Sequence, residues 1–322
     1  MKNETPTASK PNQNRAFTTY SLVFLIYMLA VILFGAWVRI SGSGDGCGAN
    51  WPHCHGEWIP TALLDEYSTL IEYTHRVTSG ILGPMVIALV VWAWKRFGSH
   101  PVFWASIVTT IFIVFESLIG AGLVLAELVG SNDSVARAVV MSIHLVNTMM
   151  LTGSAALVIW WSTGKQMPHW RSRTPLTWLI LVGLVGLIVT NMTGAVTALG
   201  DTLFPTSPTI GEGLFQQVRD DLSPANHFLV RLRIIHPIVA ITTAFFLMVL
   251  TWVIRLREVP KLTERWAEIA LAMVLAQTVI GVINIMLSAP GWIQMIHLLF
   301  AQFVWISALF LMLTTMMNSE RS

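Results

Sequence analysis

Eight apolar stretches dominate the chain of 322 residues, and each is long enough to cross a lipid bilayer as a helix. A membrane-spanning helix needs roughly 20 consecutive, mostly apolar residues. Only 11% of the residues are charged, against roughly 25% in soluble domains. We therefore predict an all-α membrane protein with eight transmembrane helices in contact with membrane lipid. The stretches run over Tyr20–Ile40, Ile71–Trp94, Phe103–Ala126, Val135–Trp161, Leu176–Leu199, Phe228–Ile254, Ala267–Leu287 and Trp292–Met316.

The distribution of basic residues predicts the orientation of these helices, because cytoplasmic loops carry an excess of Lys and Arg. One set of loops, together with both chain ends, holds 13 of the 19 Lys and Arg. We therefore predict a multi-pass protein of the cell membrane (plasma or inner membrane), with both termini cytoplasmic and the loops at 41–70 and 200–227 outside. Residues 1–16 are polar, which predicts a disordered cytoplasmic tail. The net charge of +2, without a basic run, predicts no nucleic-acid partner.

Internal similarity divides the chain into two halves. Segment 74–96 resembles segment 235–257 at an offset of 161 residues, and 113–125 resembles 275–287 with Gly120 aligned to Gly281. Segment 142–151 likewise resembles 294–303. Each half holds an even number of spans, so both halves enter and leave on the same side of the membrane. We predict two pseudo-symmetric four-helix bundles, an N-terminal half over 17–164 and a C-terminal half over 165–322.

Four histidines, two in each half, lie about six residues inside the outer end of an even-numbered span: His75, His144, His236 and His297. A lone membrane histidine more often makes an interhelical hydrogen bond, but four at one depth favour a shared task. A planar macrocycle held in a four-helix bundle needs one histidine from each of two helices. Zinc or copper would need further ligands close by. We therefore expect these four histidines to bind haem iron.

Charged residues beside the histidines predict different tasks for the two halves. Arg76, Arg231 and Arg233 lie at helix ends, where they could pair with haem propionates or extend to the membrane surface. Glu72 precedes His75 by three residues and so shares its helix face, while the repeat aligns Glu72 with Arg233. A buried carboxylate at this position could move protons. Alternatively, Glu72 lies at the wet interface and pairs with Arg76.

The first half contains two further features. Glu116 is an intramembrane acid, opposite Gln277 in the repeat, and could have a function or only a neutral structural role. Cys47 and Cys54 lie in the first outer loop, and we expect them to form a disulfide because the outside is oxidising. That bridge could be a structural staple, or it could have a redox or substrate-covering role.

Several motifs in combination resemble those of the haem A synthase family. They are RISGSG, CGANWPHC followed by EYTHR, NMTGAVTALGDTLFP in the second half, and QMIHLLFA near the end. The resemblance covers residues 17 to 316 and implies an oxidoreductase that converts a methyl group of haem O to the formyl group of haem A, for use by terminal cytochrome oxidases. His53 and His55, which crowd the cysteine loop, and Glu116 depart from the family pattern.

The resemblance also implies a role for each site residue and a set of partners. The first half would bind the substrate haem O, and the second half would hold haem b as cofactor. Haem O synthase (a farnesyltransferase) and an electron carrier would be partners, and Cys47 and Cys54 would match the outer-loop cysteines of the family. The implied site residues are Glu72 (catalytic), His75, His144 and Arg76 (haem O), His236 and His297 (axial ligands of haem b), and Arg231 and Arg233 (propionates).

Two other classes of protein stay open at this point. A dihaem b-type membrane electron-transfer protein would need the same four histidines, but neither Glu72 nor the outer cysteine pair. A haem transporter or chaperone would use its histidines only transiently.

Overall fold

The computed structural model describes residues 11–61, 63–165, 167, 174–205, 216 and 219–317. In these ranges the chain is helical between its loops, with no strand and one isolated bridge between Cys54 and Glu57. Eight helical segments of the described chain are long and apolar enough to cross a membrane, which confirms the predicted fold class. The helices are α1 (Pro11–Ile40), α2 (Tyr67–Phe97), α3 (Pro101–Leu125), α4 (Val135–Ser162), α5 (Pro175–Leu203), α7 (Phe228–Leu232), α8 (Ile235–Arg255), α9 (Lys261–Met286) and α10 (Gly291–Met317).

The helices extend beyond the predicted apolar stretches. α2, for example, begins at Tyr67 and ends at Phe97, because a helix can continue from the hydrocarbon core through the headgroup region. α1 begins at Pro11, inside the segment predicted to be a disordered tail. Proline suits the first turn of a helix, where its missing N–H removes no hydrogen bond. Residues 1–10 of the predicted tail lie outside the described residues.

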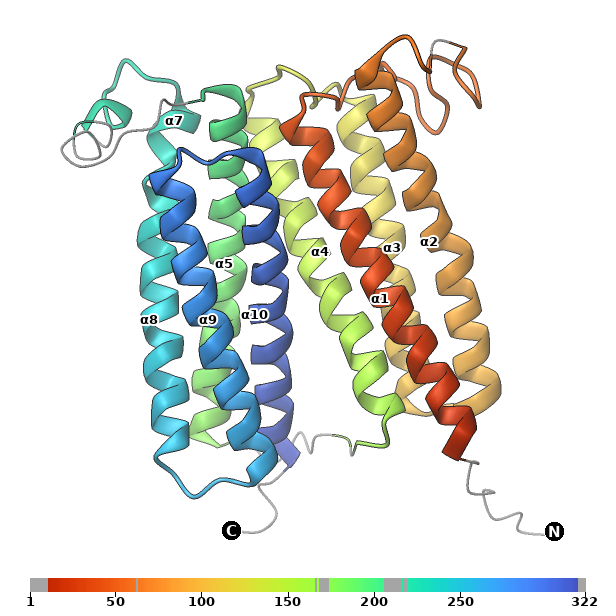
Figure 1. Ribbon diagram of the computed structural model, residues 1–322, viewed down its shortest axis with the longest axis vertical. Coiled ribbons are helices and arrows are strands. Elements are labelled where there is room, and N and C mark those ends of the chain that lie inside the picture. Colours follow the sequence, from red (N-terminus) through yellow and green to blue (C-terminus); the bar gives the residue numbers. More distant parts are fainter. Residues whose placement is uncertain are drawn as a thin grey trace.

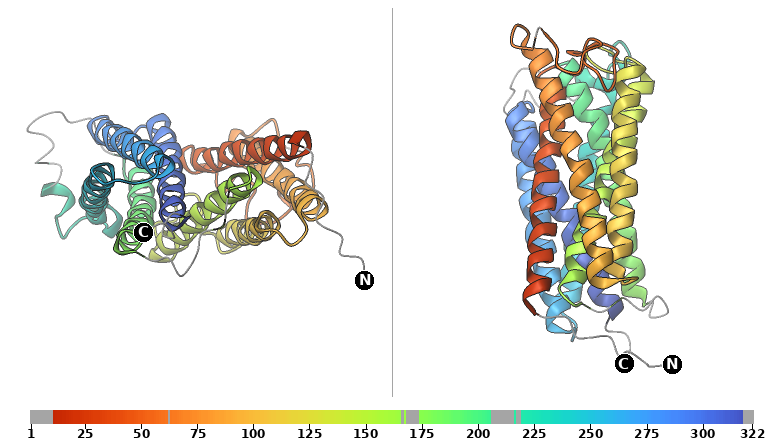
Figure 2. Two further views of the ribbon diagram at one scale, coloured as in Figure 1. Left: turned by 90° about the horizontal axis from the view of Figure 1, so that it is seen from below. Right: turned by 90° about the vertical axis from the view of Figure 1, so that its right-hand side faces the viewer.

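The spans form two groups of four, as Figures 1 and 2 show. Helices α1 to α4 pack on one another in the first group, and α5, α8, α9 and α10 pack in the second. The groups meet where α4 lies against α5, and where α10 lies against α1 and α4. The start of α1 and the end of α10 lie at the same end of the molecule, opposite the loop between α1 and α2 (Figure 1). This arrangement is compatible with the predicted halves, whose pseudo-symmetry stays a prediction.

Close packing of apolar side chains holds each group together. In the first group, Phe24, Met28 and Leu89 are almost fully buried in one cluster. Because lipid is as apolar as these side chains, tight contact rather than removal from water favours helix association in a membrane. Small residues bring the two groups together in the same way: a Cβ on Gly153 of α4 would lie only 2.8 Å from Nε1 of Trp305 on α10.

The sixth span is broken between α7 and α8. Pro237 explains the break, because it has no N–H to donate to the carbonyl of Arg233 and its ring crowds that carbonyl. The equivalent helix of the first half, α2, has Arg76 at the position of Pro237 and runs unbroken through it. The break therefore places Arg233 at a helix junction. Its counterpart in the first half, Glu72, instead lies within a continuous helix.

Candidate functional site

The first predicted histidine pair lies in the bundle of α1 to α4. His75 is carried by α2 and His144 by α4. His75 also packs against α1, where the Phe34 ring meets it edge-on with the ring centroids 5.6 Å apart. A Cβ on Gly35 would lie 3.1 Å from Cε1 of His75. Because Gly35 has no side chain, the imidazole of His75 can lie directly against α1 at this point.

The second predicted pair comes together in the other bundle. The ring centroids of His236 on α8 and His297 on α10 are 6.3 Å apart, and the ring planes are nearly perpendicular. Nδ1 of His236 lies 3.1 Å from the carbonyl oxygen of Thr190 and 3.2 Å from Oγ1 of Thr193. A hydrogen bond from Nδ1 to that carbonyl leaves Nε2 of His236 available to bind a metal ion.

Both histidines of the second pair pack against a glycine of a neighbouring helix, as His75 does. A Cβ on Gly194 of α5 would lie 3.1 Å from Cε1 of His236, and a Cβ on Gly281 of α9 would lie 3.1 Å from Cε1 of His297. The absence of a side chain at these glycines therefore sets how closely each imidazole approaches the next helix.

The spacing of His236 and His297 would suit a haem iron held between them. A metal–imidazole bond is about 2 Å long and the ring centre lies roughly 1 Å further, so two axial imidazoles have centroids roughly 6 Å apart. His236 and His297 have this spacing. Among the described residues, no group of three or more His, Cys, Asp or Glu could hold a bare metal ion. Nδ1 is buried without a hydrogen-bond partner in His75, His144 and His297, so of the four histidines His236 alone has this nitrogen held by a hydrogen bond. The donor set fits a haem better than a zinc or copper cage.

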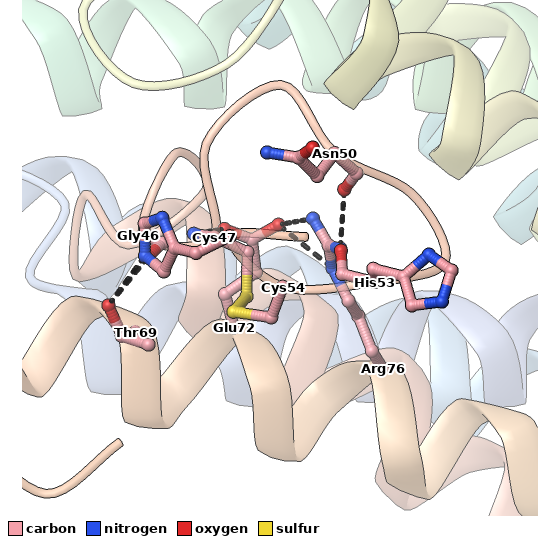
Figure 3. Close-up of polar contacts among 9 residues, drawn as sticks. Gly46, Cys47, Asn50, His53, Cys54, Thr69, Glu72 and Arg76 are labelled. Atoms are coloured by element: carbon pink, nitrogen blue, oxygen red, sulfur yellow. Dashed lines mark hydrogen bonds and ion pairs between the residues drawn. A yellow bond between two sulfur atoms is a disulfide. The ribbon is translucent and has the colours of Figure 1, made fainter. Parts of the chain in front are cut away.

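Glu72 is buried beneath the first outer loop (Figure 3). Its side chain forms an ion pair with Arg76, one helical turn further along α2, and the Arg76 Nε lies 3.1 Å from Oε1. Oε2 of Glu72 accepts a 2.8 Å hydrogen bond from the backbone N–H of Cys47. The pairing of Glu72 with Arg76 is therefore present, but Glu72 is only 3% exposed and does not lie at a wet interface.

The outer loop folds over this ion pair. Cys47 and Cys54 form the predicted disulfide, and Arg76 Nη1 donates 2.6 Å hydrogen bonds to the carbonyl oxygens of Asn50 and His53. Nε2 of His55 lies 2.8 Å from the carbonyl oxygen of Gly46. The side chain of His55 therefore belongs to the loop's own hydrogen-bond network. His53 contributes its backbone carbonyl oxygen to Arg76 (Figure 3).

Arg233 occupies a different setting in the second half. Its Nε lies 3.0 Å from Oδ1 of Asp201 and its Nη1 lies 3.8 Å from Oδ1 of Asp221. Nη2 donates to the carbonyl oxygens of Gly200, at 2.8 Å, and of Phe204. Burial raises the pKa of the Asp221 carboxyl, and the nearby Arg233 opposes that shift. Arg233 is thus buried and fully engaged by its own half.

Arg231 precedes Arg233 by two residues, and it is exposed. The three arginines predicted to contact haem propionates therefore differ: Arg76 and Arg233 are held by carboxylates and backbone carbonyls, whereas Arg231 faces outward.

Arg39 lies next to the sites, although the sequence predicts no role for it. It extends from the outer end of α1 into the second half, where Nη1 donates to the Ala198 carbonyl at 2.6 Å and to the Thr202 hydroxyl. Nη2 donates to Oε1 of Gln294 at 2.8 Å. The only signal in the sequence was its place in the RISGSG motif, directly before the first outer loop.

The fold and these contacts define a multi-pass helical membrane protein in which the rings of two histidines, His236 and His297, lie at a spacing that would suit a haem iron. The chain belongs to the COX15-CtaA family of cytochrome oxidase assembly proteins, which matches residues 18–309.

Three curated relatives carry two different names. A Thermus thermophilus protein named "Protoheme IX farnesyltransferase" is 41% identical over 293 residues, covering 91% of this chain and 47% of the relative. A protein of Shouchella clausii named "Heme A synthase" is 27% identical over 79% of this chain and 82% of its own length. One of Alkalihalophilus pseudofirmus with the same name is 48% identical over 33% of this chain and 35% of its own length. The chain thus spans about half the length of the Thermus relative.

Proposed function

We propose that this protein is a haem A synthase, an oxidoreductase that converts a methyl group of haem O to the formyl group of haem A for terminal cytochrome oxidases. Membership of the cytochrome oxidase assembly family and relatives named "Heme A synthase" support this assignment. The observation that carries it is the buried Glu72 carboxylate, held by the outer loop and three residues before His75. An electron-transfer protein has no need of such an acid.

The two halves have different tasks in this proposal. The first half, residues 17–164, binds haem O between His75 and His144. The second half, residues 165–322, holds haem b between His236 and His297, and bound haem supplies one-electron chemistry at its iron. The contact of His236 Nδ1 with the Thr190 carbonyl suits a permanent cofactor, because it orients the ring whether or not substrate is present.

Glu72 holds or moves a proton at the reacting methyl group. It shares a helix face with His75, and burial keeps water from competing for its carboxylate. Arg76 balances its charge, and the Cys47 N–H fixes the direction of Oε2. A positioned acid or base of this kind contributes about 10²–10⁴ to the rate of a reaction.

The arginines contribute positive charge at the outer end of each bundle, where propionates would lie. Arg76 serves the haem O site, and Arg231 and Arg233 serve the haem b site. Arg76 and Arg233 are already held in place by carboxylates, so each would exchange such a contact to pair with an incoming propionate.

The proposal implies a location and three partners. The protein lies in the cell membrane with both termini cytoplasmic. Haem O is its substrate, and oxidation of a methyl to a formyl group removes four electrons when water supplies the oxygen, so an electron carrier is needed. A haem O synthase supplies the substrate. The Thermus relative supports the last partner, since a protein named as a farnesyltransferase contains a region similar to this chain.

The function is tested in cells that make haem O but no haem A. Cells producing the chain should accumulate a haem with one oxygen more and two hydrogens fewer than haem O, identified by mass spectrometry of the extracted pigment. Glu66→Gln, which alters an exposed acid just before α2, is the matched control and should leave this product unchanged. Unchanged haem O together with bound haem b would contradict the proposal and favour a dihaem b-type electron-transfer protein.

A further inference from the structure

His144 differs from the other three histidines in what lies behind its ring. In the second half, Gly281 packs against His297. The repeat aligns Gly281 with Gly120, but a Cβ on Gly120 would have no neighbour within 4 Å, so Gly120 does not position His144 in this way. A carboxylate approaches the ring instead. Oε1 of Glu116, on α3, lies 3.6 Å from Nδ1 of His144. This separation is longer than a hydrogen bond, and such contacts commonly shorten when a ligand binds.

Two residues of α4 hold the Glu116 carboxylate in place. Nδ2 of Asn147 donates to Oε2 at 2.5 Å and to the carbonyl oxygen of Phe112 at 2.9 Å, which uses both of its N–H groups. The Thr148 hydroxyl lies 2.5 Å from Oε1. Asn147 and Thr148 follow His144 by three and four residues, so they share its helix face. Both are buried, and the carboxylate is thereby fixed from the helix that carries the histidine.

The second half lacks this arrangement. Gln277 occupies the position of Glu116, and Phe300 and Ala301 occupy the positions of Asn147 and Thr148 when His297 is aligned with His144. The Gln277 amide nitrogen lies 3.4 Å from Nε2 of His297, which is the other ring nitrogen. The acid and both residues that hold it therefore differ together between the two halves, as expected if the three act as a unit.

We propose that Glu116, held by Asn147 and Thr148, is the positioning residue of His144. Nδ1–H of His144 donates to the carboxylate, which fixes the ring and leaves Nε2 for the iron of the substrate haem. A carboxylate behind a ligating imidazole also makes it a stronger donor, so ferric iron is stabilised over ferrous iron in the first half. The inference rests on the proposed function, because it takes His144 as a ligand of haem O.

The test is a titration of purified full-length protein, carrying its haem b, with ferric haem O. Glu116→Gln preserves the size of the side chain and removes its charge. It should weaken haem O binding about 10- to 100-fold, the usual effect of losing such an outer partner. The midpoint potential of the haem O that still binds should rise, and the haem b spectrum should stay unchanged. Asn147→Ala should shift affinity and potential in the same direction by less.

Thr109→Val is the matched control. It removes the 3.1 Å hydrogen bond from Thr109 to Ser154, which joins the same two helices two turns away from Glu116. It should change neither affinity nor potential. Equal losses in Thr109→Val and Glu116→Gln would show a merely structural role and overturn the inference.

His144→Ala separates this inference from the proposed function. If His144→Ala abolishes haem O binding while Glu116→Gln matches the wild type in affinity and potential, the positioning role is wrong and the haem site stands. If His144→Ala binds haem O as the wild type does, the haem O site itself is misplaced, and the role of Glu116 falls with it.

Discussion

The backbone N–H of Cys47 donates a 2.8 Å hydrogen bond to Oε2 of Glu72. This contact joins the first outer loop to the buried acid of α2. The disulfide to Cys54 and a 3.1 Å hydrogen bond from the His55 N–H to the Cys47 carbonyl keep Cys47 in place above the carboxylate. The orientation of Glu72 therefore depends on the folded loop as well as on its own helix.

The disulfide loop should consequently affect catalysis but not the cofactor. Replacing Cys47 and Cys54 with serine removes the covalent closure that holds the Cys47 N–H over Glu72. We expect slower conversion of haem O, measured by pigment extraction, with haem b absorbance retained because the change is confined to the first half. In the unreduced wild type, both cysteines should resist alkylation, and full alkylation of both would contradict the bridge.

The glycines behind the histidines should control haem b occupancy. Gly194→Ala and Gly281→Ala each place a methyl group about 3 Å from an imidazole, closer than ordinary van der Waals contact. We expect both variants to lose haem b, seen as reduced low-spin absorbance per purified chain. Gly83→Ala, whose Cβ would have no neighbour within 4 Å, is the control. Normal haem content in both test variants would show that these glycines do not position the rings.

Arg39 should stabilise the association of the two halves. Arg39→Met leaves the Gln294 and Ala198 oxygens without their donor, and hydrogen bonds to charged groups contribute about 1.5–3 kcal/mol. We expect a lower thermal unfolding midpoint in detergent solution. Arg15→Met, at the exposed opposite end of the same helix, should leave the midpoint nearly unchanged. An equal midpoint in the two variants would exclude this role for Arg39.

The orientation of the chain is predicted from its basic residues. A reporter fused after Met316 should be cytoplasmic, and one inserted at the exposed Ala225 should be external. Protease protection in sealed cells measures both. The reverse pattern would place the disulfide loop in a reducing compartment and contradict the proposed location.

The spans and the matching positions of the histidines in the two halves could be predicted because both depend on local pattern. Continuous hydropathy marks a membrane helix, and the common offset between His75 and His236 places them at equivalent depths. The pairing of Glu72 with Arg76 could also be predicted from the sequence, because residues four apart are neighbours on a helix.

Contacts between distant helices could not be predicted in the same way. The hydrogen bond of Arg39 to Gln294 joins residues 255 positions apart, and the contact of Glu116 with Asn147 depends on the rotation of α3 against α4. No sequence period encodes that rotation, because several faces of each helix are apolar. The burial of Glu72 depended on a loop conformation, which hydropathy does not describe.

The central claim, that Glu72 acts in the substrate half and His236 in the cofactor half, is tested by extracting haem from Glu72→Gln and His236→Ala proteins purified from cells that make haem O. Glu72→Gln should retain haem b and convert about 10²–10⁴ times less haem O. His236→Ala should lose most of the low-spin haem b absorbance. Wild-type conversion by Glu72→Gln, or loss of haem b from it while His236→Ala retains haem b, would contradict the assignment of the two halves.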